Sequence, residues 1–260
     1  MTILNKIIHK KKEEVALLKE NNIVEKEEKI RKKLPTFAEL VRKNNKMNII
    51  AEIKRASPSK GMINDGVDPA EQAKRYEASG VQAISVLTDM PFFQGTMDDL
   101  RQVRKAVDLP ILNKDFIIDS VQIDRAKRAG ANIILLIAAA LDDASFRHLY
   151  EYCREQELEV LCEVHNEEEM ERVLQLDATL IGINNRNLKT FEVDLQTTAR
   201  LAKMVDGSEA ILVSESGLAT QADSEPVRDA GAGAVLVGET FMRAERVDEA
   251  IAQFQVPLLA

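Results

Sequence analysis

A repeated unit of a short apolar run, a polar loop and an amphipathic stretch begins near residue 47 and continues almost to the end of the chain. The apolar runs have the length of buried strands, and the stretches between them have the spacing of helices. The expected strands cover residues 48–54, 82–88, 110–115, 131–138, 159–165, 180–184, 210–215 and 234–238. Eight strands that alternate with helices predict a parallel sheet buried on both faces.

Capping residues mark the helices between these strands. Asp68 and Pro69 are typical of a helix start, and Gly80 follows the expected helix end. The same pattern predicts further helices over residues 119–130, 166–176 and 220–231. Eight such units in about 210 residues match a closed (β/α)8 barrel, the TIM barrel of the α/β class. A doubly wound open sheet is the alternative topology.

Residues 1–46 precede the repeated units. They contain a charged helical pattern from Ile3 to Asn21 and a shorter apolar pattern over residues 37–41. We expect an N-terminal helical extension, residues 1–46, that packs on the barrel of residues 47–260 as part of a single domain. The charged helix and the 37–41 segment are candidates to cover the mouth of the barrel.

Composition excludes several classes of protein. The net charge of −8 argues against a nucleic-acid-binding protein, which needs a basic face. No apolar run approaches the ~20 residues of a membrane span, and the charged run at residues 10–14 does not fit a signal peptide. Cys153 and Cys162 form no disulfide or metal motif, so a cytoplasmic protein with reduced thiols is expected.

A monomer is expected, with a homodimer as the alternative.

Charged and amide side chains recur near the carboxyl ends of five expected strands. They are Glu52 and Lys54, Lys114, Glu163, Asn184 and Glu215. Because side chains alternate along a strand, each of these strands has an apolar or small residue below its charged or amide group on the same face. A barrel would therefore carry a charged layer above an apolar floor at its carboxyl mouth, where barrel active sites lie. An ion-pair network that serves stability alone is the alternative.

Small and polar residues follow the first strand and the last two. They are Ser57, Ser216, Gly217, Gly238 and Glu239. The loops after strands seven and eight form the usual phosphate site of such barrels, so a phosphorylated small-molecule substrate is expected. The histidines lack zinc-like spacing, and we expect neither a metal nor a cofactor. A Schiff base on Lys54 or Lys114 is a further possibility.

Several segments together resemble the indole-3-glycerol phosphate synthase family. They are residues 50–59 (IAEIKRASPS), 92–95 (FFQG), 112–116 (LNKDF), 181–186 (IGINNR) and 214–217 (SESG). The resemblance covers nearly the whole chain. It implies conversion of 1-(2-carboxyphenylamino)-1-deoxyribulose 5-phosphate to indole-3-glycerol phosphate, with loss of CO2 and water, in tryptophan biosynthesis.

The resemblance also implies roles for individual residues. Lys114 would be the general acid, Glu163 its acid/base partner, and Lys54 the group that holds the substrate carboxylate. The remaining implied sets are orienting groups at Glu52, Asn184 and Glu215, phosphate contacts at Ser57, Gly217 and Gly238, and walls for the aromatic ring at Phe116, Leu135 and Leu236. Ser216 and Glu239 are further expected substrate-binding residues. Arg186 fits the family pattern without a derived role.

Burial and a second nearby cation both lower the pKa of a lysine, and a lowered pKa suits acid/base catalysis near neutral pH. We therefore expect the catalytic lysine to have a lowered pKa. The closed-ring iminium accepts the decarboxylation electrons, so the reaction needs no cofactor. Two other functions stay open: another phosphosugar isomerase or aldolase of this fold, and a barrel that binds a metabolite without turnover.

Overall fold

The expected strands close into one parallel barrel. The computed structural model describes residues 2–20, 34–205 and 208–259. Around the barrel the strand order is β1-β10-β9-β8-β7-β6-β5-β4, and β1 pairs with β4 to close it, which excludes the open sheet. The barrel strands are β1 (Asn48–Ile53), β4 (Ala83–Leu87), β5 (Ile111–Lys114), β6 (Ile133–Ile137), β7 (Glu159–Val164), β8 (Leu180–Asn184), β9 (Ile211–Glu215) and β10 (Ala234–Val237).

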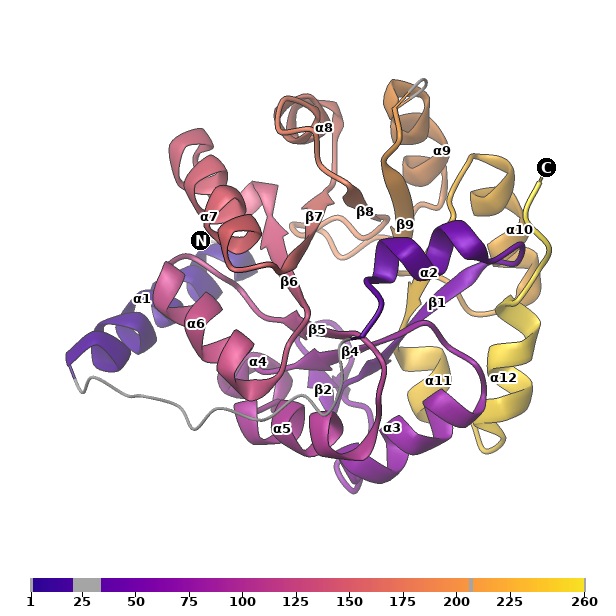
Figure 1. Ribbon diagram of the computed structural model, residues 1–260, viewed down its shortest axis with the longest axis horizontal. Helices are drawn as coiled ribbons and strands as arrows, with labels where there is room; N and C mark the ends of the chain where they lie inside the picture. Colours follow the sequence, from indigo (N-terminus) through magenta and orange to yellow (C-terminus); the bar gives the residue numbers. More distant parts are fainter. Residues whose placement is uncertain (1, 21–33, 206–207, 260) are drawn as a thin grey trace.

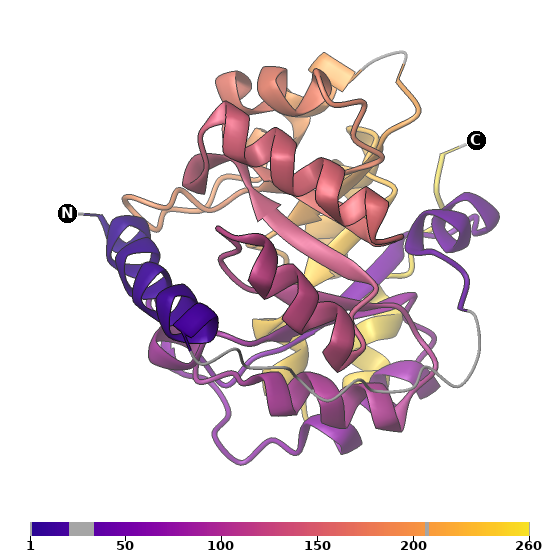
Figure 2. The same cartoon turned by 60° about the vertical axis from the view of Figure 1, so that its left-hand side comes forward.

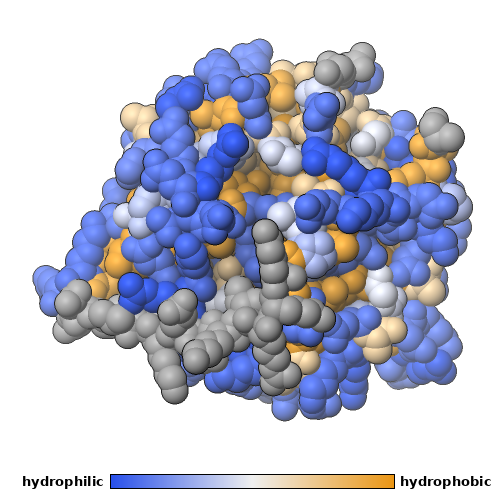
Figure 3. All heavy atoms as spheres, in the orientation of Figure 1, coloured by the Kyte–Doolittle hydropathy of each residue, from blue (hydrophilic) through white to orange (hydrophobic). Residues whose placement is uncertain are grey.

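Helices surround the barrel on its outer side (Figure 1). They are α3 (Pro69–Ala78), α4 (Met90–Phe93), α5 (Met97–Ala106), α6 (Ser120–Ala129), α7 (Asp143–Glu155), α8 (Glu167–Leu174), α9 (Gln196–Ala202), α10 (Gln221–Asp229), α11 (Glu239–Arg243) and α12 (Val247–Phe254), with 3-10 turns η1 (Ala138–Ala140) and η2 (Lys203–Val205). The predicted cap at Asp68 is present: its carboxylate accepts hydrogen bonds from Ala70 N and Glu71 N. Hydrophilic side chains cover most of the face in Figure 3.

Apolar packing falls into two layers separated by the strands. The outer layer joins the strands to the helices and contains residues such as Ile49 and Leu136. The inner layer fills the barrel and contains Ile50, Leu112 and Leu161, the floor residues expected beneath the charged layer. The alternation along each strand thus directs one set of side chains to the helices and the other into the lumen.

The N-terminal extension reaches both ends of the barrel. Helix α1 (Ile3–Glu20) lies at the carboxyl mouth, and α2 (Phe37–Lys43) lies at the opposite end; the two helices are at left and right in Figure 2. The prediction that residues 37–41 cover the mouth is therefore wrong. Phe37 is fully buried with the inner layer, and the backbone N–H of Phe37 donates to Glu159 at the start of β7 at 2.6 Å.

One further element lies near the site. A hairpin of β2 (Ala56–Ser57) and β3 (Gly61–Met62) extends the loop that follows β1. Among the described residues, no helix has both the length and the apolar character that a membrane span requires.

Candidate active site

A cavity of about 740 Å³ opens at the carboxyl ends of the strands. Its walls include every residue that the sequence singled out for a site, namely Glu52, Lys54, Ser57, Lys114, Phe116, Leu135, Glu163, Asn184, Arg186, Glu215, Ser216, Gly217, Leu236, Gly238 and Glu239. The strand alternation brings the charged members to one layer because all the strands point the same way.

The ammonium group of Lys114 lies between two buried carboxylates. Its Nζ is 2.9 Å from Glu163 Oε2 and 2.6 Å from Glu215 Oε2. Glu163 and Glu215 are 3% and 2% exposed, so water does not replace either contact. The three side chains come from β5, β7 and β9, which alternate around the barrel.

The expected depression of the lysine pKa is contradicted. Burial alone would lower the pKa of Lys114, but the negative charges of Glu163, Glu215 and Glu52 outweigh burial and raise it. Lys114 is therefore a stably charged group that donates hydrogen bonds, and a second cation does not dominate its surroundings.

The two carboxylates that flank Lys114 differ in acidity. Burial raises the pKa of Glu215, and the like charges of Glu163 and Glu52 add to this effect against the attraction of Lys114. Burial alone would also raise the pKa of Glu163, but Lys114 and His165 hold it below the usual range. Glu163 thus stays ionised while Glu215 is the easier group to protonate, a division suited to proton transfer.

Two further side chains hold Glu163, and a third holds one of these two. The Asn184 side-chain amide donates to Glu163 Oε1 at 3.1 Å, and His165 Nε2 lies 3.3 Å from the same oxygen. Glu169 Oε2 is 3.0 Å from His165 Nδ1. Burial alone would lower the pKa of His165, but hydrogen bonds and charge from the two glutamates raise it to about 9. The shared strand face of Glu163 and His165 was visible in the sequence, but the role of Glu169 was not.

Lys54 and Glu52 form a second pair on β1. Lys54 Nζ lies 2.6 Å from Glu52 Oε1. The Glu52 carboxylate packs against the backbone of Gly238, where any Cβ would collide with it. Glycine at position 238 is therefore needed for the close approach of β1 and β10 beneath the mouth.

One side of the mouth is polar and carries the expected phosphate loops. Thr240 Oγ1 donates to the Leu218 carbonyl at 2.8 Å, which ties the loop after β10 to the loop after β9. The Glu239 carboxylate lies 3.2 Å from Arg243 Nε and 3.7 Å from Lys60 Nζ, so two cations offset its charge.

Arg186 organises the long loop after β8. Its guanidinium donates to the Phe191 carbonyl at 3.1 Å, and its backbone N–H donates to the Asn184 side chain at 3.0 Å. Arg186 thus links the loop to Asn184, the residue that holds Glu163. This structural role could not be derived from the sequence.

Apolar side chains line other parts of the cavity. Phe116 after β5 and Leu135 on β6 lie across the barrel from the loops after β9 and β10, and Leu236 on β10 lies beneath those loops. Phe93 on α4 packs on Phe116 with ring centroids 5.9 Å apart. Side chains of α1 also line the cavity, namely Ile3, Leu4 and Ile7. The sequence offered this charged helix as a candidate to cover the mouth, but it did not assign these three residues to the cavity.

No cluster of three or more histidine, cysteine or carboxylate side chains able to hold a metal ion occurs in the described parts of the chain. The cavity combines an apolar side, a polar loop side and a layer of lysines and carboxylates between them. A closed eight-stranded parallel barrel with this layer at its carboxyl mouth defines an enzyme of the (β/α)8 class.

Comparison with known proteins narrows this class. The family model described as indole-3-glycerol phosphate synthase matches residues 4–254. The synthase of Oceanobacillus iheyensis is 51% identical over 259 residues, covering 100% of this chain and 98% of that protein. The synthase of Exiguobacterium sibiricum is 49% identical over 245 residues, 94% of this chain and 93% of that one. The chain belongs to the indole-3-glycerol phosphate synthase family.

A solved structure of 3-hexulose-6-phosphate synthase shares the fold. It has a TM-score of 0.59 at 17% identity and covers 80% of this chain and 98% of that chain. At this identity the likeness supports the barrel architecture.

Proposed function

We propose that the protein converts 1-(2-carboxyphenylamino)-1-deoxyribulose 5-phosphate to indole-3-glycerol phosphate, as a carboxy-lyase of tryptophan biosynthesis. Membership of the synthase family over residues 4–254 supports the reaction. The single structural observation that carries the proposal is Lys114, held between Glu163 and Glu215 in a cavity with one apolar and one polar side.

The two ends of the substrate match the two sides of the cavity. The aromatic ring would lie against Phe116, Leu135 and Leu236, and the phosphate would lie at the loops of Ser57, Gly217 and Gly238. Lys54 would hold the ring carboxylate, and the paired Glu52 would fix the direction of Lys54. The reacting carbons then lie between the ends, near Lys114.

Ring closure forms a bond between the ring carbon that bears the carboxylate and the ketone carbon of the sugar. Negative charge develops on the ketone oxygen, and the charged Lys114 would donate a proton to it. The ring carboxylate leaves as CO2, and its bonding electrons return to the ring through the iminium. No external electron acceptor is required.

Dehydration completes the product. The new hydroxyl would take a proton from Lys114 and leave as water, and the neighbouring carbon loses a proton, which forms the carbon–carbon double bond of the five-membered ring. Glu163 is the proposed base because its pKa is held low, and Asn184 and His165 would orient it. Glu215 would return a proton to Lys114, since its own pKa is raised.

Incubation with the carboxyphenylamino-deoxyribulose phosphate, followed by indole fluorescence, tests the proposal. Turnover is expected in the presence of excess EDTA, because the proposed steps use side chains alone. Turnover of phosphosugars that lack the aromatic ring would favour an isomerase or aldolase, and binding without turnover would favour a metabolite-binding barrel.

We further propose that the protein acts in the cytoplasm as a monomer. Cys153 and Cys162 are buried free thiols, which accords with a reducing compartment. Light scattering of the purified protein at several concentrations checks the monomer, and a constant mass of twice that of one chain would indicate a homodimer instead.

A further inference from the structure

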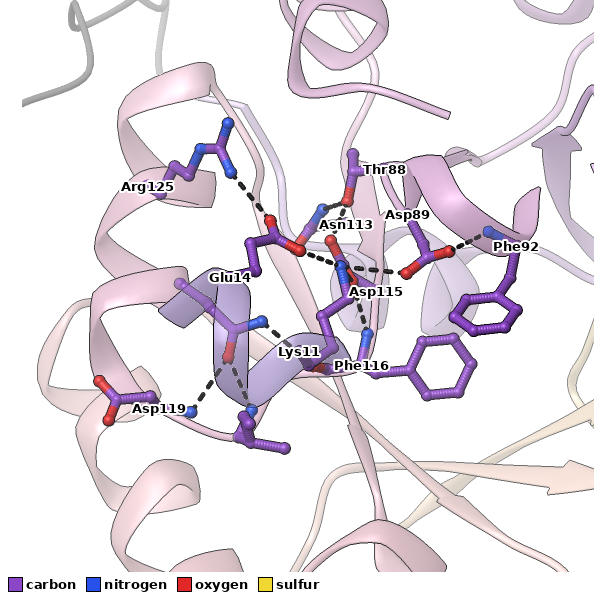
Figure 4. A network of polar contacts seen from close by, with 12 residues as sticks. Lys11, Glu14, Thr88, Asp89, Phe92, Asn113, Asp115, Phe116, Asp119 and Arg125 are labelled. Carbon is purple, nitrogen blue, oxygen red and sulfur yellow. Dashed lines mark hydrogen bonds and ion pairs between the residues drawn. The ribbon is translucent and has the colours of Figure 1, made fainter. Parts of the chain in front are cut away.

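A buried charge cluster lies beside the cavity, between α1 and the ends of β4 and β5 (Figure 4), and one of its members, Asp115, also lines the cavity. At its centre is Lys11, which is 1% exposed. Its Nζ lies 2.8 Å from Asp115 Oδ1, 3.1 Å from Asp89 Oδ2 and 2.8 Å from Glu14 Oε2. Glu14 in turn contacts Arg125 on α6 at 3.2 Å.

Each of the two aspartates controls a turn that carries an aromatic ring of the cavity. Asp89 caps α4, where its Oδ1 accepts from Phe92 N at 2.9 Å, and Phe93 follows directly. Asp115 Oδ1 accepts from Phe116 N at 2.8 Å. Phe93 and Phe116 pack on each other and line the cavity.

Asp115 also follows Lys114 in the chain, on the opposite face of the strand end. Thr88 at the end of β4 donates to Asp115 Oδ2 at 2.5 Å, and Asn113 donates to Thr88 at 2.8 Å. The outer faces of β4 and β5 are therefore joined by one hydrogen-bonded set that ends on Lys11. A displacement of Asp115 would move both Lys114 and Phe116.

We propose that Lys11 is a positioning residue for the aromatic end of the substrate, acting by holding the turns of Asp89 and Asp115 together. The inference rests on the proposed function for the identity of that end. The ammonium group neutralises two carboxylates that face the same buried space, and it reaches them from a different element, α1. Helix α1 thus supplies a charge that orders the aromatic wall, in addition to the apolar side chains that it places at the mouth.

The charge balance explains why a cation is required there. Burial raises the pKa of Asp89, Lys11 opposes this, and the like charge of Asp115 adds to it. Without Lys11, two desolvated carboxylates would repel each other across the junction of the two turns. The turns would then separate, or one aspartate would take up a proton and change its hydrogen bonds.

The test compares Lys11→Met with Lys12→Met, an exposed neighbour on the same helix. For each full-length protein, kcat and KM are measured together with the dissociation constants of 2-aminobenzoate and of inorganic phosphate. Lys11→Met is expected to lose roughly 10- to 100-fold in kcat/KM and to bind 2-aminobenzoate more weakly, because small displacements of positioning groups are costly. Phosphate binding should stay unchanged, since the loops after β1, β9 and β10 would hold the phosphate end of the substrate. Lys12→Met should match the parent protein.

Equal weakening of both ligands in Lys11→Met would indicate a general structural role and overturn the proposal, and so would unchanged kinetics. If Lys11→Met does not fold, Asp89→Asn carries the test, because an amide keeps the cap on Phe92 but loses the ion pair. Asp89→Asn should show the same one-sided loss to a smaller degree, and parent-like behaviour would refute the proposal. If the parent protein has no turnover, the proposed function fails, while the two binding constants still decide the role of Lys11.

Discussion

The carboxylate of Glu215 occupies the space that a side chain at position 182 would need. Glu215 reaches Lys114 across β8, and only the missing Cβ of Gly182 leaves room for it. We expect Gly182→Ala to displace Glu215 and to lower kcat by roughly 10- to 100-fold, since a shift near 1 Å is enough. Steady-state kinetics measure this effect. Gly66→Ala is the matched control, because a Cβ at Gly66 meets no atom within 4 Å; equal rates in the two variants would refute the argument.

Lys114→Met is expected to abolish most turnover, with a loss of ~10²–10⁴-fold for a missing general acid. Phosphate binding should persist, because the loops after β9 and β10 are not altered. Indole fluorescence measures the rate, and circular dichroism checks the fold. The exposed Lys203 offers a control substitution to Met. Parent-like kcat in Lys114→Met would remove this lysine from the mechanism.

Stability should depend on pH through His165. Its folded pKa is raised to about 9, so its contribution is fully present below the unfolded pKa near 6.5 and is lost as pH rises through about 9. The shift sets an upper limit of about 3 kcal/mol. Urea unfolding at pH 6 to 9 measures the loss, and His165→Gln should flatten the curve in this window. An identical pH dependence in the variant would assign the effect to other groups.

Inorganic phosphate should raise the melting temperature and inhibit competitively, because it binds the native loops alone. Ser216→Asp should abolish this response, since its carboxylate would meet the anion. Ser216→Asn is the neutral control: Ser216 has φ 67°, a conformation that Asp and Asn both tolerate. A persistent thermal shift in Ser216→Asp would move the phosphate site away from this loop.

Truncation should separate the two helices of the extension. Removal of residues 1–33 deletes α1 but keeps α2, and we expect a folded protein with a raised KM. Removal of residues 1–46 also deletes Phe37, whose burial is worth ~3–5 kcal/mol, and should cost much of the stability. Denaturant unfolding and kinetics on both proteins test this. Equal stability of the two truncated proteins would show that α2 is dispensable.

Strand periodicity predicted the barrel and its charged mouth because both depend on alternation, which is local. The location of α2 could not be predicted, since either end of a barrel offers apolar surface to an amphipathic helix. One indication was Glu159, a carboxylate at the start of a buried strand, which needed donors such as the N–H groups of Phe37 and Ala38.

Lys11 was missed for a related reason. Within the charged run of residues 10–14 it resembles a solvated lysine, and only its i, i+4 spacing from Ile7 and Val15 places it on the buried face. The direction of the pKa shift of Lys114 was predicted wrongly, because it depends on how many carboxylates the register of the barrel strands brings close to the ammonium group. Three carboxylates raise the pKa of Lys114. The sequence had suggested only a neighbouring cation, which would lower this pKa.

The attachment of both N-terminal helices also sets an order of events during synthesis. Lys11 finds its partners in Asp89 and Asp115, and α2 is anchored to Glu159, which lies 122 residues after Phe37. Helix α1 therefore cannot dock until β5, the third of the eight barrel strands, has been made, and α2 cannot dock until β7, the fifth, has been made. The cavity wall that α1 supplies therefore forms only after strands that follow it in the chain, so competence for catalysis waits for those strands.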